Sequence, residues 1–253
     1  MAGNNPVAQF KISVIEEFSF LGYDISFTNS SLLMLISTLT IGYFMFPRKN
    51  GSSDHVPSRF QVAQEVVFSA ISDMVHDSIG KKAKHYFPFI FTLFLFILSA
   101  NMWGMLPVPG LGAFTSTSHI AVTAMLALIV FCVVIAVGVK NAGLGYFAHF
   151  APKGVPLPMQ FIIVPIEIAS FLARPVTLAV RLCGNMVAGH IVLKIFGTFI
   201  VSLLGAGFLA VLGILPFFIL LAMNALEFFV AFLQAYIFAT LSCIYISESV
   251  EAH

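Results

Sequence analysis

The chain contains 253 residues, of which 59% are hydrophobic and only 9% are charged, and its mean hydropathy is +1.00. Soluble domains carry about 25% charged residues, so this composition excludes a soluble globular protein and predicts an integral membrane protein. The formal net charge of +1 gives no basis for a nucleic-acid partner. The apolar runs are long and continuous, which favours an all-α membrane fold over the alternating strands of a barrel.

The N-terminal segment, residues 1–28, is polar and mixed in composition. It has no basic stretch followed by an apolar core and a small-residue cleavage site, so we expect no signal peptide. The first apolar run, residues 31–46, predicts a membrane helix close to the lower length limit for crossing the hydrocarbon core.

An amphipathic segment, residues 57–84, follows a hydrophilic linker. Its apolar residues recur at helical spacing with acids and amides between them, which predicts a helix on the cytoplasmic membrane surface or against neighbouring helices. These apolar residues are Val62, Val66, Ile71, Val75 and Ile79.

Four more apolar runs complete the predicted single membrane domain, residues 1–253, with about five membrane helices. Two of them, residues 86–106 and 119–139, have the length of ordinary spans. The other two, residues 159–196 and 202–246, are too long for upright helices, because the first would extend about 57 Å. Periodicity leaves open one strongly tilted or near-horizontal helix, or a pair of shorter ones, for each long run.

The basic residues indicate the orientation of the chain. The loops after the first and third apolar runs carry eight of them, whereas residues 107–118 and 197–201 carry none. The positive-inside rule therefore places the basic loops in the cytoplasm and the N-terminus outside. If each long run crosses once, the C-terminus is cytoplasmic. The eight are Arg48, Lys49, Arg59, Lys81, Lys82, Lys84, Lys140 and Lys153.

Ionisable and amide side chains interrupt the first long run, where a charge costs roughly 2.5–3.5 kcal/mol on insertion. At about 100° per residue, Glu167, Arg174, Arg181 and Asn185 fall on one narrow stripe of a helix, and His190 points to the opposite side. Such a stripe suits a hydrated pathway better than lipid.

A second polar stripe is predicted on the last run. Its members are Asn224, Glu227, Gln234 and Tyr245. If the two long helices face each other, one stripe carries arginine and the other carries carboxylate and amide groups. Lys194 and Glu248 are near segment ends, where we expect them to reach an interface or to form pairs.

These side chains differ in the chemistry that they offer. A guanidinium stays protonated, so Arg181 is a fixed positive charge that does not relay protons. Glu167, Glu227 and His190 can change protonation state and relay protons through water. A fixed cation between such groups blocks proton leakage and favours the ionised form of a passing carboxylate, from Glu227 or from a partner subunit.

Other function classes lack their sequence signatures. There is no HExxH motif for an intramembrane metalloprotease and no GxxxxGK[ST] motif for ATP binding. No internal repeat supports a self-contained carrier. The cysteines, Cys132, Cys183 and Cys243, form no CxxC pair and are interpreted as buried thiols. We expect no metal and no cofactor.

Several runs together resemble subunit a of F-type ATP synthases. They are PIEIASFLARPVTLAVR at 165–181, RLCGNMVAGH at 181–190, ALEFFVAFLQAYIFATLSCIYI at 225–246 and NMWGMLP at 101–107. The resemblance covers most of the chain and is most specific in its C-terminal half.

The resemblance implies a non-catalytic stator subunit beside a rotating ring of c-subunits, with two offset aqueous half-channels separated by Arg181. Asn185 and Gln234 match polar residues near that arginine. Glu167, His190 and Glu227 match residues of the proton routes, and His119, Tyr245 and Asn101 are further candidates. His119 stands where the family often has an aspartate, so a channel-mouth role and a structural polar cap both stay open.

The resemblance also implies partners and a location. The partners are the c-ring, the b-subunit peripheral stalk, other ATP synthase subunits and membrane lipid, and the transported ion is the proton. The location is a bacterial inner membrane, with the N-terminus periplasmic and the C-terminus cytoplasmic. The histidine at 190 and glutamate at 227 exchange places relative to many bacterial members and match the mitochondrial-type arrangement.

Overall fold

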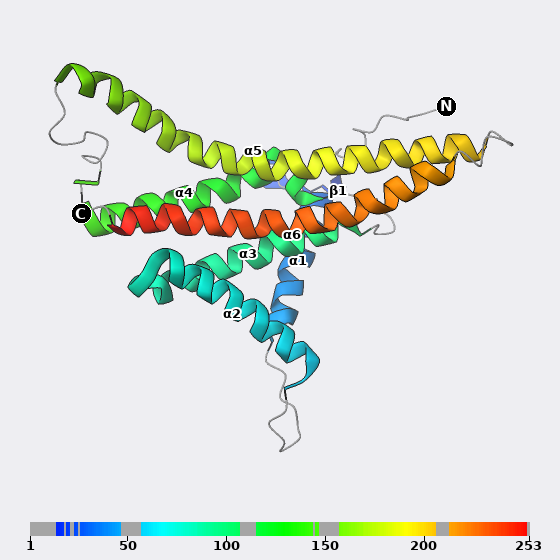
Figure 1. The fold of residues 1–253 in the computed structure, drawn as a ribbon, viewed down its shortest axis with the longest axis horizontal. Helices are drawn as coiled ribbons and strands as arrows, with labels where there is room; N and C mark the ends of the chain where they lie inside the picture. The colour runs from blue at the N-terminus through cyan, green and yellow to red at the C-terminus, as the bar shows by residue number, and fades with distance from the viewer. Residues whose placement is uncertain are drawn as a thin grey trace. The chain divides into compact units, whose positions relative to one another are not determined.

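Helices make up most of the described chain in the computed structural model (Figure 1). The structure describes residues 14–17, 19–20, 23–24, 26–46, 57–106, 115–143, 145–146, 157–205 and 213–251. The helices are α1 (Asn29–Met45), α2 (Arg59–Ile79), η2 (Gly80–Lys82), α3 (Ala83–Met105), η3 (Ser116–Ser118), α4 (Ile120–Ala142), α5 (Leu157–Leu204) and α6 (Ile214–Glu251).

Four helical stretches of the described chain are long and apolar enough to cross a membrane. They are Arg59–Met105, Ile120–Ala142, Met159–Leu204 and Ile214–Val250. The apolar helix α1 has 17 residues, which is shorter than the roughly 20 residues of an ordinary span. The predicted all-α, multi-pass membrane fold is confirmed.

The two long runs are each one continuous helix, so the pair of shorter helices is excluded for both. α5 has 48 residues and includes Pro165 and Pro175, and it would extend about 72 Å if straight. The predicted boundary at 197–201 is wrong, because α5 continues through it to Leu204. Gly197 alone does not end a helix, whereas the following GAGFLAVLG stretch carries three glycines.

The chain folds into two compact units, each made of several separate segments. Unit 1 comprises Met1–Ile41, Phe96–Val122 and Leu182–Ala235. Unit 2 comprises Gly42–Leu95, Thr123–Arg181 and Tyr236–His253. Each unit contains parts of several helices, so residues close in sequence can belong to different units.

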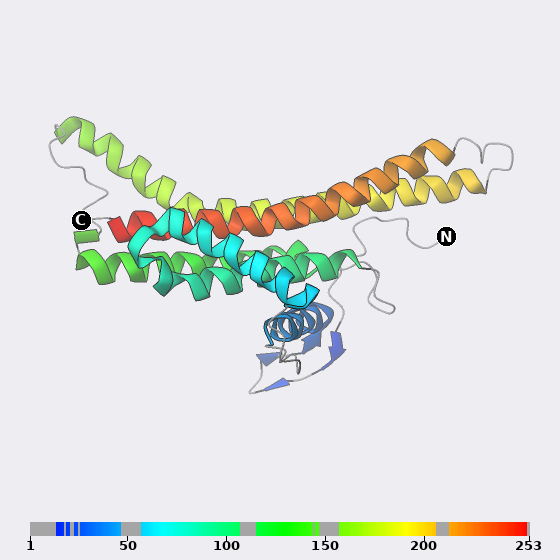
Figure 2. The same cartoon turned by 60° about the horizontal axis from the view of Figure 1, so that its bottom comes forward.

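Unit 1 contains the N-terminal strands, part of α1, the end of α5 and the start of α6. Strand β1 (Val14–Glu16) pairs antiparallel with β4 (Phe27–Thr28), and β2 (Ser19–Phe20) pairs with β3 (Tyr23–Asp24). Both views show the end of α5 and the start of α6 side by side (Figures 1 and 2).

Helix α1 is fixed to α3 by polar contacts inside unit 1. The Trp103 indole N–H donates to Thr40 Oγ1 at 2.8 Å, and the Ser99 hydroxyl donates to the carbonyl of Ser37 at 3.3 Å. Ser37 is fully buried. These bonds let hydroxyl groups sit between apolar helices without losing their hydrogen bonds.

Unit 2 contains α2, whose ends are defined by local geometry. Ser58 and Gln61 form a capping box at its N-terminus, and Gly80 adopts a positive φ of 68° at its C-terminus, which glycine allows without strain. Phe68 makes edge-on ring contacts with Phe87 and Phe91 of α3.

The predicted apolar face of α2 is confirmed for its C-terminal half only. Ile71, Val75 and Ile79 are buried, whereas Val62 and Val66 are exposed. The N-terminal half of the helix therefore presents apolar side chains that the chain itself does not cover.

The cysteine interpretation is also confirmed only in part. Cys243 is buried, but Cys183 is half-buried and Cys132 is exposed on the apolar helix α4. An apolar membrane helix can expose a thiol because lipid replaces the protein interior as its apolar surroundings. All three are free thiols.

Candidate functional site

A buried histidine and a buried carboxylate meet inside unit 1. His190 on α5 is 4% exposed and Glu227 on α6 is 6% exposed, and His190 Nδ1 lies 3.7 Å from Glu227 Oε1. Within the described residues, neither carboxylate oxygen of Glu227 has a hydrogen-bond partner. Burying a carboxyl group without a hydrogen-bond partner costs free energy. Ionisable groups buried in membrane helices are typically functional.

Gly189 allows α5 to approach Glu227 this closely. A Cβ atom at position 189 would lie 2.7 Å from Glu227 Oε1 and 3.0 Å from its Cδ. Real Cβ atoms do not tolerate such a distance, so any larger residue would displace the carboxylate. The glycine is therefore part of the geometry of the His190–Glu227 pair.

Hydroxyl groups extend from His190 toward α3. Thr115 Oγ1 lies 2.5 Å from His190 Nε2, and both groups are buried. The Thr115 side chain occupies space left by Gly104 of α3, where a Cβ atom would overlap it. The imidazole thus contacts a carboxylate through one nitrogen and a hydroxyl through the other.

Asn101 of α3 is fully buried next to this hydroxyl chain. Its Oδ1 accepts from the Thr117 hydroxyl at 2.7 Å, and its Nδ2 donates to the carbonyl of Ala231 on α6 at 3.2 Å. The amide therefore links η3 to α6. The structure thus brings together His190 and Glu227, two of the predicted site residues, and it joins Asn101 to Thr117 and Ala231 in the same unit.

The hydroxyl residues of this cluster are not among those predicted from the sequence. The run TSTS at 115–118 includes Thr115, Thr117 and Ser118, all buried. Ser118 also accepts, through its carbonyl, a bond from the Cys183 thiol at 3.0 Å. Four consecutive hydroxyls before an apolar helix were the available signal, but such a run is also typical of a helix cap.

The residues of the polar stripe predicted on the last helix differ in burial. Gln234 lies two turns beyond Glu227 and is also buried, at 6% exposure, whereas Asn224 is exposed. In unit 1, Glu227 and Gln234 therefore belong to the protein interior, and Asn224 does not.

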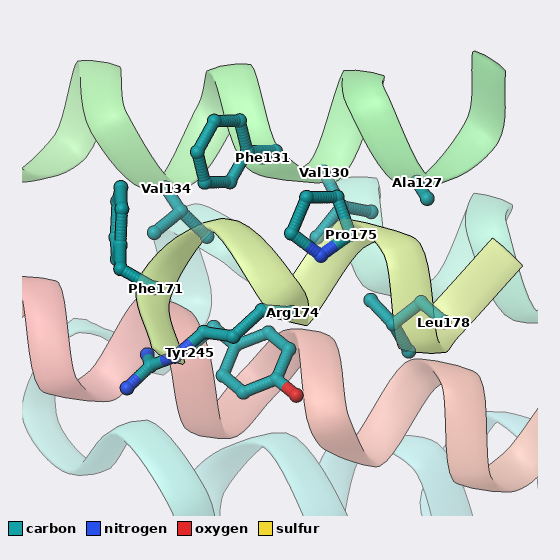
Figure 3. A pocket seen from close by; sticks show the side chains of 9 residues that line it. All are labelled: Ala127, Val130, Phe131, Val134, Phe171, Arg174, Pro175, Leu178 and Tyr245. Atoms are coloured by element: carbon teal, nitrogen blue, oxygen red, sulfur yellow. The ribbon is translucent and has the colours of Figure 1, made fainter. Parts of the chain in front are cut away.

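Arg174 and Tyr245 form a separate cluster in unit 2 (Figure 3). The Arg174 guanidinium forms an ion pair with Glu248 of α6 and lies 4.8 Å from the centre of the Tyr245 ring. Phe171 and Pro175 of α5 line the small cavity beside it, together with residues of α4. Arg174 is thus engaged by a partner in its own unit, and the expectation that Glu248 forms a pair is confirmed.

The other predicted residues of α5 lie closer to the surface. Arg181 is exposed and forms no ion pair among the described residues, while Glu167 is half-buried. Asn185, in unit 1, is exposed as well. Because they are four residues apart, Arg181 and Asn185 lie on the same face of α5. Both side chains are exposed on the surface of the helix.

His119 connects η3 to α4 in unit 1. Its backbone N–H donates to the carbonyl of Ser116, and its own carbonyl accepts from the Val122 N–H at 3.1 Å. The described residues contain no cluster of three metal-ligating side chains.

Comparison with known proteins places this architecture in one family. The family model described as ATP synthase A chain matches residues 31–247. A protein named ATP synthase subunit a from Hyphomonas neptunium is 48% identical over 98% of this chain and 96% of its own length. Proteins of the same name from Maricaulis maris and Paramagnetospirillum magneticum are 45% and 44% identical, with 98% of this chain covered in each case. The expected resemblance is confirmed: the chain belongs to the ATP synthase A chain family.

Proposed function

We propose that the chain is the proton-translocating stator subunit of a rotary ATP synthase in a bacterial inner membrane. Its relatives carry the name ATP synthase subunit a, and they match it along nearly its full length. The chain has no phosphate-binding loop sequence, so ATP chemistry belongs to other subunits. The partners are then a ring of c-subunits and the b-subunit stalk.

Arg181 is the residue assigned to the boundary between two half-channels. It is exposed on an apolar helix and forms no ion pair within the described residues. A charge in that position is costly in lipid, but it is stabilised when a carboxylate of a neighbouring subunit faces it. A permanent guanidinium favours the ionised carboxylate, so one proton leaves the rotor before the next arrives.

The single observation that carries the proposal is the buried His190–Glu227 pair and its hydroxyl chain. Both groups can exchange protons. Thr115 contacts His190, and Thr117 of the same short segment separately contacts Asn101 of α3. Titratable and hydrogen-bonding groups of this kind in an otherwise apolar region are what proton transfer requires. We assign this cluster to one half-channel, and the family resemblance assigns Gln234, Asn185 and Glu167 to the proton path as well.

The lengths of α5 and α6 fit this assignment. Helices of 48 and 38 residues exceed an upright span, and a course close to the membrane plane would let them follow the curved outside of a ring. We place the N-terminus in the periplasm and the C-terminus in the cytoplasm, following the distribution of basic residues.

The first test is Arg181→Ala in the assembled complex. We expect proton-driven ATP synthesis in membrane vesicles to fall to background while the subunit composition stays unchanged, because the rotor carboxylate loses its counter-charge. Coupled synthesis that persists in this variant would contradict the role of Arg181.

The matched test compares Arg181→Lys with Arg174→Lys, the same change seven residues apart on α5. Arg181→Lys should also lose synthesis, because an ammonium lacks the planar, delocalised fork of arginine. Arg174→Lys should retain most of it, because an ammonium can still pair with Glu248. Equal loss in both variants would point to a general need for arginine on this helix instead.

A further inference from the structure

A pocket of about 530 Å³ lies in unit 2, and neither His190 nor Glu227 lines it. It forms where η2 and the first turn of α3 meet the last turn of α4. Its volume falls within the roughly 300–1,000 Å³ range of small-molecule sites. The residues that line it are Lys81, Lys82, Lys84, His85, Tyr86, Lys140 and Asn141.

The lining offers positive charge and hydrogen-bond donors. Among the described residues that line the pocket, four are lysines and none is a carboxylate. Lys82 Nζ donates to Asn141 Oδ1 at 3.4 Å, which uses the amide oxygen and links η2 to α4. The amide nitrogen of Asn141 is buried and has no hydrogen-bond partner within the described chain.

This arrangement specifies the ligand class. Ammonium groups are donors only, so the four lysines of the lining can donate to a ligand but cannot accept from it. A ligand that satisfies them must carry negative charge and several acceptor oxygens. A phosphate group has both properties, and lysine binds it as a point charge.

The helix ends at the pocket indicate the depth of lipid headgroups. Lys84, His85 and Tyr86 directly precede the apolar part of α3, and Lys140 lies in the last turn of α4, so two membrane helices leave the hydrocarbon region here. The same lysines belong to the loops that the positive-inside rule assigns to the cytoplasm. Basic pockets between membrane helices on this side are suited to anionic headgroups.

We infer that the pocket binds the phosphate group of an anionic phospholipid headgroup at the cytoplasmic surface. The site is independent of the proton route, since none of its residues belongs to the His190–Glu227 cluster. Free phosphate has the same chemistry, so the test must separate the two sources.

The test uses the purified complex reconstituted in phosphatidylcholine vesicles containing spin-labelled phosphatidylglycerol. The motionally restricted fraction of the label measures bound anionic lipid. Lys140→Gln should weaken that binding about fivefold, and Asn141→Leu should weaken it without changing the charge. Lys140→Arg keeps the charge and should bind like the unsubstituted complex.

The matched control is Arg59→Gln, which removes one positive charge from the same side of the membrane but outside the pocket. It should leave the bound fraction unchanged. Equal binding by Arg59→Gln, Lys140→Gln and the unsubstituted complex would overturn the inference.

A second arm measures binding of labelled inorganic phosphate to the delipidated complex. Subtracting the phosphate bound by the Lys140→Gln complex from that bound by the unsubstituted complex removes the contribution of phosphate sites on other subunits. Displacement of the spin-labelled lipid by phosphate would support one shared site. Phosphate binding that depends on Lys140, with no change in lipid binding, would overturn the assignment to a lipid.

Discussion

At the residue scale, the imidazole of His190 has two different neighbours, a carboxylate on one side and a hydroxyl on the other. A neutral imidazole donates through one nitrogen and accepts through the other, and a change of tautomer exchanges these roles. A histidine between Glu227 and Thr115 can therefore pass a proton from one neighbour to the other without moving far. This is the property expected of a relay group in an apolar region.

The exchange of the two titratable residues tests this relay. We expect His190→Glu and Glu227→His each to reduce ATP synthesis by at least about tenfold, since each leaves two like groups 3.7 Å apart. The double variant should recover more activity than either single variant, because it restores one carboxyl and one imidazole. Vesicles energised by an imposed proton gradient provide the measurement, and a double variant worse than both singles would contradict a shared path.

The titratable and amide residues of the site could be predicted from the sequence, but its hydroxyl residues and the pairing of His190 with Glu227 could not. Asn101, His190, Glu227 and Gln234 are conspicuous because polar groups are expensive inside apolar runs. Which of them meet depends on the register between α5 and α6, and helical spacing within one helix carries no information on that register. The same spacing also grouped Arg174 with Arg181, although Arg174 pairs with Glu248.

At the element scale, the close approach of α5 to α6 in unit 1 depends on a residue without a side chain. Gly189 faces Glu227 directly, whereas Gly197 on the same helix has nothing within 4 Å of a built Cβ atom. Both glycines sit inside α5, where replacement by alanine favours the helix to the same extent, about 1 kcal/mol. The two positions therefore differ only in what a methyl group would meet.

This difference gives a matched pair of variants. Gly189→Ala should lower ATP synthesis by about tenfold, because the methyl group displaces a carboxylate that must be placed to within about an ångström. Gly197→Ala should leave synthesis unchanged. Subunit content checks that both complexes assemble, and unimpaired synthesis in Gly189→Ala would show that the position of the Glu227 carboxylate is not critical.

The helix boundaries show where local sequence information ends. The predicted spans at 86–106 and 119–139 agree with α3 and α4 to within a few residues, because glycine, proline and polar residues flank them. The boundary between the long helices was misplaced because Gly197 interrupts an apolar run without breaking it. A helix can absorb the cost of one glycine when the surrounding residues are strong helix formers.

At the scale of the whole molecule, the proposed sidedness of the chain rests on its basic residues. Eight lysines and arginines follow the first and third apolar runs, and GAGFLAVLG, which connects α5 to α6, has none. If α5 and α6 each cross once, the end of the chain emerges on the same side as the lysines of the basic pocket in unit 2.

A cysteine at the last position tests this orientation. His253→Cys should react with a membrane-impermeant maleimide in inside-out vesicles and not in intact spheroplasts. The unsubstituted chain is the control, because its three native cysteines all lie within membrane helices. Reaction from the periplasmic side would reverse the assigned topology.

The bond between Trp103 and Thr40 has a practical consequence. Trp103 is the only tryptophan in the chain, and its indole N–H is held by a residue of the neighbouring helix α1. The emission of an indole depends on its hydrogen bonding and on the polarity around it. In the isolated chain, intrinsic fluorescence is therefore an unlabelled optical reporter of whether α1 is seated against α3.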